Sequence, residues 1–314
     1  LRELAEMFAD HAVVAKWEAQ FQGEAAALLD EGRKAEKGGD LREAHRCGRE
    51  LMHVWPDLPE GRQFVDSIQQ QYPRVVVGVT LPAVTTDPGQ WQNWASRRGS
   101  RLTCRTLMQF VGRGTEGGKY HCPFGEMQIQ ELGLRLALQI DPQLSELAGA
   151  AGLTGYDLAR KLLAMAEPGD PAYRLDWAEL LDQVRVREVY GVDADLRRPH
   201  VRPEALLETV VVGPVGGSGS SAEAPASTGP YVVESRSEEE VVYVANPGYS
   251  LGPRQPKEIV ERCFRKEAAA LTALERREID VLDRINPWDL DKLGALKDVV
   301  LEPYGLPSVH CLVP

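Results

Sequence analysis

The stretch RVVVGVTLP, Arg74–Pro82, decides the fold class of this chain. β-branched residues fill most of it, a pattern typical of a strand that is covered on both faces. It begins directly after Tyr72-Pro73, where the helical pattern of the preceding residues ends. We therefore expect a buried strand here and a domain boundary just before it. Further runs with strand composition are Leu134–Ile140, Gln183–Val192, Leu206–Val212, Pro230–Glu234 and Glu240–Ala245.

Segments with helical periodicity lie between the expected strands. Strands that alternate with helices in one chain indicate a mixed α/β fold. The expected helical segments are Trp91–Val111, Gly155–Met165, Trp177–Leu181, Ala268–Arg277 and Pro287–Leu293.

The first part of the chain, from Leu1 to about Gln70, has a helical pattern throughout. A turn is expected at Gly38-Gly39, because glycine accepts left-handed backbone angles at no steric cost. Asp40 can then cap a second helix over Leu41–Val54, which ends before Pro56. We therefore expect two antiparallel helices.

The spacing of small residues in this helical part resembles one tetratricopeptide repeat of about 34 residues. Two positions depart from the motif: Glu31 replaces a large apolar residue, and Gly48 replaces an aromatic one. A single repeat cannot bury its apolar face, so it must pack on a helix around Ala12–Phe21, on the next domain, or on repeats upstream. The residues that carry the resemblance are Gly32, Gly39-Asp40, Ala44 and Pro56.

Composition and charge exclude several classes of protein. The chain has 314 residues, long enough for about two domains, and 43% of them are hydrophobic. A net charge of -11 opposes nonspecific binding to nucleic acid or anionic lipid, which requires a basic face. The apolar runs, such as the one around Val75–Val79, are far shorter than a membrane helix. The five cysteines form no C-x-x-C pair.

The segment Gly213–Thr228, GPVGGSGSSAEAPAST, lacks apolar periodicity. Its richness in Gly, Ser, Ala and Pro is typical of a flexible coil. We interpret it as a surface insertion, with an interdomain linker as the alternative.

Catalytic and metal-binding signals are weak. His121-Cys122 could suggest a hydrolase, but adjacent residues of a strand point to opposite faces, so His121 is badly placed to deprotonate Cys122. The histidines show no metal-ligand spacing such as H-E-x-x-H. The glycines of Gly112–Lys119 lack the G-K-[ST] ending of a phosphate-binding loop, and a hairpin turn explains them better. The sequence therefore predicts no catalytic residue, no metal site and no cofactor.

Three short motifs follow one another in the second half of the chain. Thr228-Gly229-Pro230-Tyr231 places a turn before a strand, and Asn246-Pro247-Gly248-Tyr249 places one after a strand. Glu278-Ile279-Asp280 follows a helix, and its last carboxylate can accept backbone N–H groups where the next strand starts. Their order and spacing resemble those of the extracellular solute-binding proteins of family 5, the oligopeptide-binding type. The helix Lys266–Arg277 and the strand Glu258–Phe264 also fit this family.

The resemblance extends more faintly upstream and covers Arg74 to Pro314. The family's W-S-D-G-x-P loop is absent between Ile140 and Leu153, which indicates that this part of the lobe is shortened or rebuilt. The matching upstream segments are Val75–Pro82 for the opening strand, Asp87-Pro88 for the following turn, Ser100–Phe110 for the first helix of the lobe, and Leu153–Leu163 for a later helix.

The resemblance implies a type II periplasmic-binding-protein-like α/β fold with a mixed sheet. Residues 73–314 would form an incomplete first lobe, preceded by a tetratricopeptide-like helical unit at residues 1–72. Ser308–Val313 resembles the strand that crosses into the second lobe, so residues 1–314 alone are expected to bind solute weakly.

The function implied by the resemblance is capture of a peptide or similar small solute for the permease of an ABC-type importer, in the periplasm or cell envelope. The alternative is a noncatalytic interaction module, in which residues 1–72 dock a protein partner and the lobe is a degenerate scaffold. An open groove is lined by aromatic and polar residues near strand ends. The expected ligand-binding residues are Tyr231, Asn246, Tyr249, Trp91 and Trp94.

Overall fold

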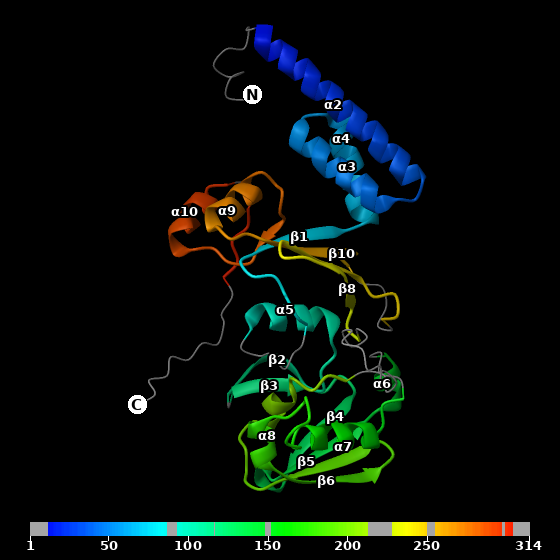
Figure 1. Cartoon of the computed structure of the whole chain (residues 1–314), viewed down its shortest axis with the longest axis vertical. Coiled ribbons are helices and arrows are strands. Elements are labelled where there is room, and N and C mark those ends of the chain that lie inside the picture. Colours follow the sequence, from blue (N-terminus) through cyan, green and yellow to red (C-terminus); the bar gives the residue numbers. More distant parts are fainter. Residues whose placement is uncertain are drawn as a thin grey trace.

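The computed structural model describes residues 12–86, 93–115, 117–147, 152–212, 228–249, 255–296 and 299–303. It arranges them in three parts along the long axis of the molecule (Figure 1). Helices between Ala12 and Gln71 form one end, a five-stranded sheet with its helices forms the middle, and a smaller α/β unit forms the other end.

The N-terminal part consists of α2 (Ala12–Lys37), α3 (Leu41–Val54) and α4 (Pro59–Gln71). The carboxylate of Asp40 accepts a 3.0 Å hydrogen bond from the Glu43 backbone N–H, so the predicted cap and the predicted second helix are both confirmed. A Cβ on Gly32 would lie 2.7 Å from the Phe64 ring, which explains the small residue at this position. The core of these helices is Ala25, Leu29, Ala44, Leu51, Phe64 and Ile68.

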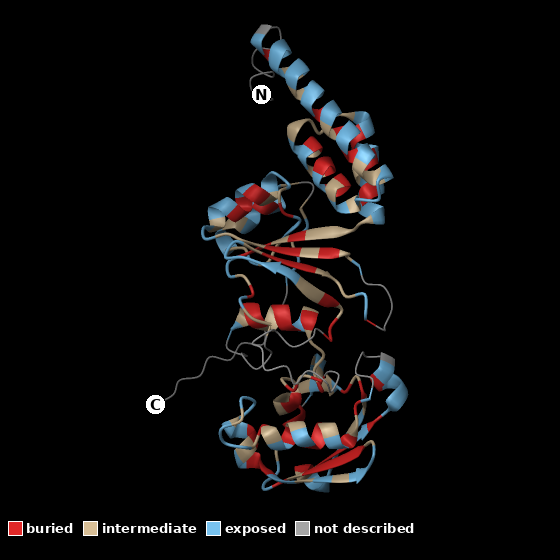
Figure 2. Cartoon of the chain, turned by 45° about the vertical axis from the view of Figure 1, so that its right-hand side comes forward, coloured by how far each residue is buried: buried red, intermediate tan, exposed pale blue. Residues whose placement is uncertain are grey.

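This arrangement differs from the predicted pair of helices. The expected helix around Ala12–Phe21 and the first helix of the hairpin are one continuous helix, α2. α4, which begins with Pro59 at its first turn, is a third helix that supplies Phe64 and Ile68 to the shared core. The apolar face of the hairpin is therefore covered from within the chain, while the first half of α2 projects beyond α3 and α4 (Figure 2).

The five-stranded sheet has the order β11-β1-β10-β9-β8. β1 is parallel to β10 and β11, whereas β8, β9 and β10 are antiparallel neighbours. The predicted strands at Arg74, Pro230, Glu240 and Glu258 are confirmed. Their bounds are β1 (Arg74–Val79), β8 (Tyr231–Arg236), β9 (Glu240–Ala245), β10 (Glu258–Cys263) and β11 (Val281–Leu282).

Helices cover both faces of this sheet, as the sequence of β1 predicts (Figures 1 and 2). On one face, α9 (Glu267–Glu275) adds Ala273 to a cluster that contains Val76 and Val260. On the other face, α5 (Trp94–Thr103) contributes Leu102 to the cluster around Tyr231, Val241 and Tyr243. The C-terminal described elements are η3 (Pro287–Asp289) and α10 (Leu290–Gly294).

The smaller unit contains a hairpin, β2 (Gln109–Gly114) with β3 (Gly117–His121), which confirms the expected turn in the glycine-rich stretch. Its four-stranded sheet has the order β4-β5-β7-β6. The strands are β4 (Gly125–Gln130), β5 (Arg135–Ile140), β6 (Leu181–Glu188) and β7 (Gly191–Leu196), and the helical elements are η1 (Glu131–Gly133), α6 (Pro142–Leu147), α7 (Gly155–Ala164), α8 (Leu175–Leu180) and η2 (Pro203–Leu207).

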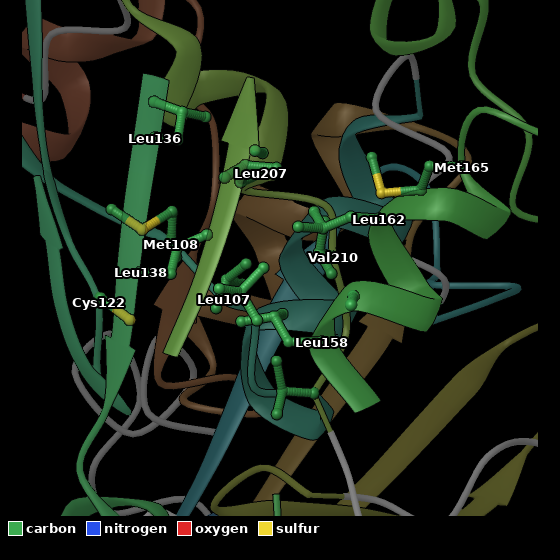
Figure 3. Packing of buried hydrophobic residues seen from close by; sticks show 14 of the residues in the cluster. Leu107, Met108, Cys122, Leu136, Leu138, Leu158, Leu162, Met165, Leu207 and Val210 are labelled. Carbon is green, nitrogen blue, oxygen red and sulfur yellow. The ribbon is translucent and has the colours of Figure 1, made fainter. Parts of the chain in front are cut away.

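The largest buried cluster of the molecule lies in this unit (Figure 3). Side chains of α7, such as Leu158 and Leu162, face those of β5, such as Leu138 (Figure 3). Trp177 of α8 is fully buried, and its Nε1 donates a 2.9 Å hydrogen bond to the Leu162 carbonyl. The unit therefore has its own core rather than a surface shared with the five-stranded sheet.

Four predictions about secondary structure are wrong in whole or in part. Gln183–Val192 is not one strand, because a turn at Val189 and Tyr190 divides it between β6 and β7. Leu206–Val212 is not a strand: η2 occupies its start, and Val211 makes only an isolated bridge to Thr106. The helix expected over Trp91–Val111, and the family helix matched to Ser100–Phe110, end with α5 at Thr103, because β2 uses the residues from Gln109 onward.

Several predictions concern segments outside the described residues. They are most of the Gly213–Thr228 insertion, the Asp87-Pro88 turn, Trp91, and the Ser308–Val313 strand. Within the described part of the chain, no disulfide joins the four cysteines Cys47, Cys104, Cys122 and Cys263.

Candidate ligand-binding edge of the five-stranded sheet

The carboxyl ends of the three parallel strands meet at one edge of the five-stranded sheet. Val79 at the end of β1 is paired with Cys263 at the end of β10, and Gly78 is paired with Leu282 of β11. The turn between β8 and β9 is at the same edge, because Glu240 is paired with Arg262. We call this the carboxyl edge. In open α/β sheets, ligands bind in the crevice outside the carboxyl ends of the strands.

Arg98 of α5 holds the carboxyl edge together. Its Nε donates a 2.6 Å hydrogen bond to Glu261 of β10, and it forms a 3.4 Å ion pair with Asp283, just after β11. It also donates a 2.9 Å hydrogen bond to the Leu81 carbonyl, in the connection after β1. One guanidinium therefore joins α5 to the ends of all three parallel strands.

Glu261 is the buried anion of this arrangement, with a side chain only 2% exposed. Its second oxygen accepts a 3.2 Å hydrogen bond from the Ala83 backbone N–H. Burial opposes the charged form of Arg98, but the hydrogen bond to Glu261 and the charges of Glu261 and Asp283 together outweigh it and raise the pKa of Arg98. Burial raises the pKa of the neighbouring Tyr243, and the Glu261 charge raises it further. Arg98 therefore stays charged, and the edge is fixed by a compensated buried ion pair.

An open pocket of about 510 Å³ lies at this edge, between the β8–β9 turn and the end of β10. Its lining carries charges of both signs: Arg262 pairs with Glu240 at 3.4 Å, and Arg265 pairs with Glu238 at 3.7 Å. The connection after β1, at the same edge, carries exposed apolar side chains, Leu81 at 66% and Val84 at 67% exposure. Arg236, at the end of β8, donates a 2.6 Å hydrogen bond to the Val84 carbonyl.

Three of the predicted ligand-binding residues, Tyr231, Asn246 and Tyr249, are brought together at the opposite, amino edge of the sheet. Tyr231 is buried, and its hydroxyl donates a 3.0 Å hydrogen bond to the Pro256 carbonyl. Asn246 donates to the Gly229 carbonyl at 2.9 Å and accepts from the Gly248 N–H at 3.0 Å, so it joins two of the family motifs. Tyr249 is buried beneath the guanidinium of Arg105, 4.7 Å from its ring centroid.

Trp94 is the predicted residue that lies nearest the carboxyl edge. It begins α5, one helical turn before Arg98, and its ring lies 6.0 Å from the guanidinium carbon of Arg284, just beyond β11. Its Nε1 is buried without a hydrogen-bond partner among the described residues. Trp91 lies outside the described residues.

The amino edge anchors the N-terminal helices to the sheet. Glu258 of β10 has a side chain 1% exposed and accepts hydrogen bonds from Arg42 of α3 at 2.7 Å, Arg74 at 2.7 Å and the Tyr72 hydroxyl at 2.8 Å. Burial alone would raise the pKa of Glu258, but these three partners outweigh it and hold the pKa below its ordinary value. Burial and the bond to Glu258 raise the pKa of Tyr72 to about 12.

A second contact between the helices and the sheet uses Asp280. Its carboxylate accepts a 2.7 Å hydrogen bond from the Val76 backbone N–H, which confirms the expected role of this acid next to a strand. Arg49 of α3 forms a 3.1 Å ion pair with the same carboxylate and donates to the Arg277 carbonyl at 2.6 Å.

The His121-Cys122 pair has the geometry expected from the alternation of a strand. His121 is exposed at the end of β3, whereas Cys122 is 7% exposed and belongs to the core of the smaller unit. Burial raises the pKa of the Cys122 thiol, which opposes formation of the nucleophilic thiolate. The pair therefore does not form the activated thiol of a hydrolase.

Comparison with known proteins places this architecture in a family. The sequence model of the bacterial extracellular solute-binding proteins, family 5 middle region, matches residues 154–310, half of the chain. The chain belongs to this family. The match begins at the cap of α7 and includes the three motifs that carry the resemblance in the sequence. No curated protein sequence is significantly similar to the chain.

Solved structures of solute-binding proteins share the fold. MoaA of A. tumefaciens R10, solved with mannopinic acid, has a TM-score of 0.58 and 20% identity over 71% of this chain and 48% of its own. DppA of Helicobacter pylori, solved with the peptide STSA, has a TM-score of 0.58 and 15% identity over 74% of this chain and 51% of its own. AppA of Bacillus subtilis, solved with a nonapeptide, has a TM-score of 0.57 and 14% identity over 70% of this chain and 45% of its own.

This family 5 chain spans about half the length of the solved structures that it matches. Its type II periplasmic-binding-protein-like fold confirms the α/β class expected from the sequence. The family is one of extracellular solute-binding proteins, which are binding proteins rather than enzymes. Among the described residues, no helix is long and apolar enough to span a bilayer.

Arg98 and Glu261 were not among the residues predicted from the sequence. They are 163 positions apart, so no local spacing connects them. The sequence did hold one sign of this ion pair: Glu261 lies within the strand EIVERC. A carboxylate in a buried strand requires a charged partner from elsewhere in the fold.

Proposed function

We propose that this chain is the solute-binding component of an ABC-type importer and that it holds its solute against the carboxyl edge of the five-stranded sheet. The observation that carries the proposal is the edge itself: three parallel strands end together there, locked by Arg98 and Glu261, beside an open pocket. Membership of family 5 supports the role. The partner would be the permease of the importer, and the site of action the periplasm or cell envelope.

The charges at the carboxyl edge favour a solute that carries both a positive and a negative charge. Glu238, Glu239 and Glu240 can accept from an ammonium group, while Arg262 and Arg265 can donate to a carboxylate. A short peptide has both groups at its termini, and the exposed Leu81 and Val84 offer apolar contact for its side chains. Relatives of the same fold bind such solutes: the dipeptide-binding protein of Pseudoalteromonas sp. SM9913 was solved with Met-Leu.

We also propose that Trp94 contacts the solute, since it starts the helix that closes this edge. Contact of Tyr231, Asn246, Tyr249 and Trp91 with a solute stays a prediction. The described hydrogen bonds of Tyr231 and Asn246 support a role in holding the turns at the amino edge, whatever else they do.

A thermal-shift panel tests the proposal, because a ligand that binds only the native state raises the melting temperature. The panel holds Met-Leu, tetrapeptides, a nonapeptide, nickel with L-histidine, and mannopinic acid. We expect at least one peptide to raise the melting temperature in proportion to the logarithm of its concentration. No shift with any member of the panel would contradict the proposal.

The variant Val84→Asp is expected to weaken binding of that peptide about tenfold or more, because it replaces an apolar contact with a charge that must be desolvated. Val84 is exposed, so the fold should be unaffected. Val201→Asp is the matched control: Val201 is 80% exposed and lies in the smaller unit, just before η2. Calorimetric titration of both variants decides the outcome, and equal affinities would place the solute away from the connection after β1.

A further inference from the structure

A second cavity, of about 490 Å³, lies where α5 meets the smaller unit. Figure 1 shows α5 between the five-stranded sheet and that unit. One wall comes from α5, between Arg97 and Arg101, and from the residues that follow this helix up to Phe110. The other wall comes from η2, Thr209 and Arg174, the residue that precedes α8. Its volume is within the range of about 300–1,000 Å³ that is usual for small-molecule sites.

The lining of this cavity is strongly basic. Arg97, Arg101, Arg105 and Arg174 all contribute to it, and Glu208 is the only acid among the described lining residues. This is the reverse of the chain as a whole, whose net charge is -11. Arg97 and Arg101 are four apart on α5 and therefore share one face of the helix. Hydroxyl groups of Ser100, Thr106 and Thr209 lie among the arginines.

Not every arginine of this cavity is paired with an acid among the described residues. Arg101 reaches Glu208 at 3.7 Å, and Arg174 forms a 2.6 Å ion pair with Asp176 and a hydrogen bond with Thr209. Among the described residues, the Arg97 guanidinium has neither an ion pair nor a hydrogen-bond partner. A guanidinium offers five N–H donors in a planar fork that matches carboxylate and phosphate oxygens.

A purely structural explanation covers some of these residues. Cations near the C-terminus of a helix stabilise its dipole, which accounts for Arg101 and Arg105 beside the cap at Cys104. It does not account for Arg174, which stands at the N-terminal cap of α8, where a cation is unfavourable. Nor does it account for Arg97, in the first half of α5. The arginines of this cavity therefore come from α5, from just beyond its C-terminus and from the N-terminal cap of α8.

We propose that this cavity binds a small polyanion that carries phosphate or carboxylate groups. Two guanidiniums on one helix face can each form a paired hydrogen bond with such a group, and Arg174, oriented by Asp176 and Thr209, can contact it from the opposite wall. The site does not depend on the proposed solute site, because Arg98 faces Glu261 and Asp283 at the carboxyl edge instead.

Calorimetric titration with inorganic pyrophosphate and with citrate tests the proposal, at ionic strength matched with sodium chloride. The two probes distinguish phosphate from carboxylate as the preferred group. We expect saturable binding of at least one probe, and at least tenfold weaker binding in the double variant Arg97→Gln/Arg101→Gln. The matched control is Arg160→Gln, since Arg160 is 68% exposed and has a similar 3.6 Å surface ion pair on α7. That control should bind the probe like the unchanged protein.

If the double variant fails to fold, the single variant Arg97→Gln keeps the test decisive, because its side chain has no partner among the described residues to lose. Binding should weaken about threefold to tenfold, and Arg97→Lys should recover part of it. Absence of binding to both probes in the unchanged protein, or equal affinities in all variants, would overturn the proposal. A lowered melting temperature without any dependence on pyrophosphate or citrate would favour the dipole explanation instead.

Discussion

The variant Glu258→Gln is expected to lower the free energy of unfolding by about 2–3 kcal/mol, which urea denaturation can measure. In the unchanged protein the Glu258 carboxylate, 1% exposed, accepts hydrogen bonds from Arg42, Arg74 and Tyr72. Removal of the charge leaves the guanidinium of Arg74, 19% exposed, without its anion. This expected loss of free energy is smaller than for a fully buried ion pair, because Arg42 is 45% exposed and water can solvate its guanidinium in the variant.

The effect should depend on pH in a defined direction. Because the pKa of Glu258 is held below its ordinary value in the folded protein, the carboxylate stabilises the fold above that ordinary value. This stabilisation is lost as the pH falls through the folded-state pKa. The difference between the unchanged protein and Glu258→Gln is therefore largest near neutral pH and shrinks in acid.

The matched control is Glu234→Gln. Glu234 forms an ion pair with the same Arg42 but is 41% exposed, so its loss should cost less than about 1 kcal/mol. Equal destabilisation by the two variants would show that burial of Glu258 does not govern the junction between α3 and the sheet.

The variant Gly229→Ala should destabilise the protein by about 3 kcal/mol or more. Gly229 packs directly on the end of α5: its N–H donates a 2.9 Å hydrogen bond to the Thr103 carbonyl. An added Cβ would lie 2.5 Å from the Leu102 carbonyl oxygen, which is backbone and cannot move aside. The close contact explains why the turn before β8 contains glycine.

Gly248→Ala serves as its control, because Gly248 is exposed in the turn after β9, and an added Cβ would lie 3.4 Å from the nearest atom, Oδ1 of Asn246. It should change the free energy of unfolding by less than about 0.5 kcal/mol. A similar loss in both variants, measured by thermal denaturation, would contradict the argument from contact with α5.

Local signals in the sequence predicted most of the middle of the molecule. The β-branched run that predicts a strand buried on both faces forms β1, which lies between α5 and α9. Asp40 caps α3 and Asp280 accepts the Val76 N–H, because a short carboxylate next to a helix or strand end satisfies backbone donors wherever the rest of the chain lies.

The strands of the smaller unit were harder to predict. β2 and β4 contain glycine, glutamine and few β-branched residues, so their composition does not indicate strands, and their pairing partners stabilise them. Leu206–Val212 shows the reverse: its apolar residues Leu207, Val210 and Val212 are buried in the core without a strand partner beyond one bridge. Apolar composition there reflects burial rather than secondary structure.

The candidate site could be predicted only in part. Tyr231, Asn246 and Tyr249 follow from motifs that recur at turns, and the structure places them at the amino edge. The carboxyl edge depends on parallel pairing of β1 with β10, which are far apart in the sequence. Arg98 and Glu261 become neighbours only through that pairing.

Hydrogen–deuterium exchange with a saturating peptide from the thermal-shift panel tests the central claim most directly. A solute held at the carboxyl edge should slow exchange in residues 80–86 and 262–266, which follow β1 and end β10, and in residues 237–240, the turn between β8 and β9. Slowed exchange confined to residues 228–231 and 246–249, at the amino edge, would contradict the account and would make Tyr231, Asn246 and Tyr249 the solute contacts.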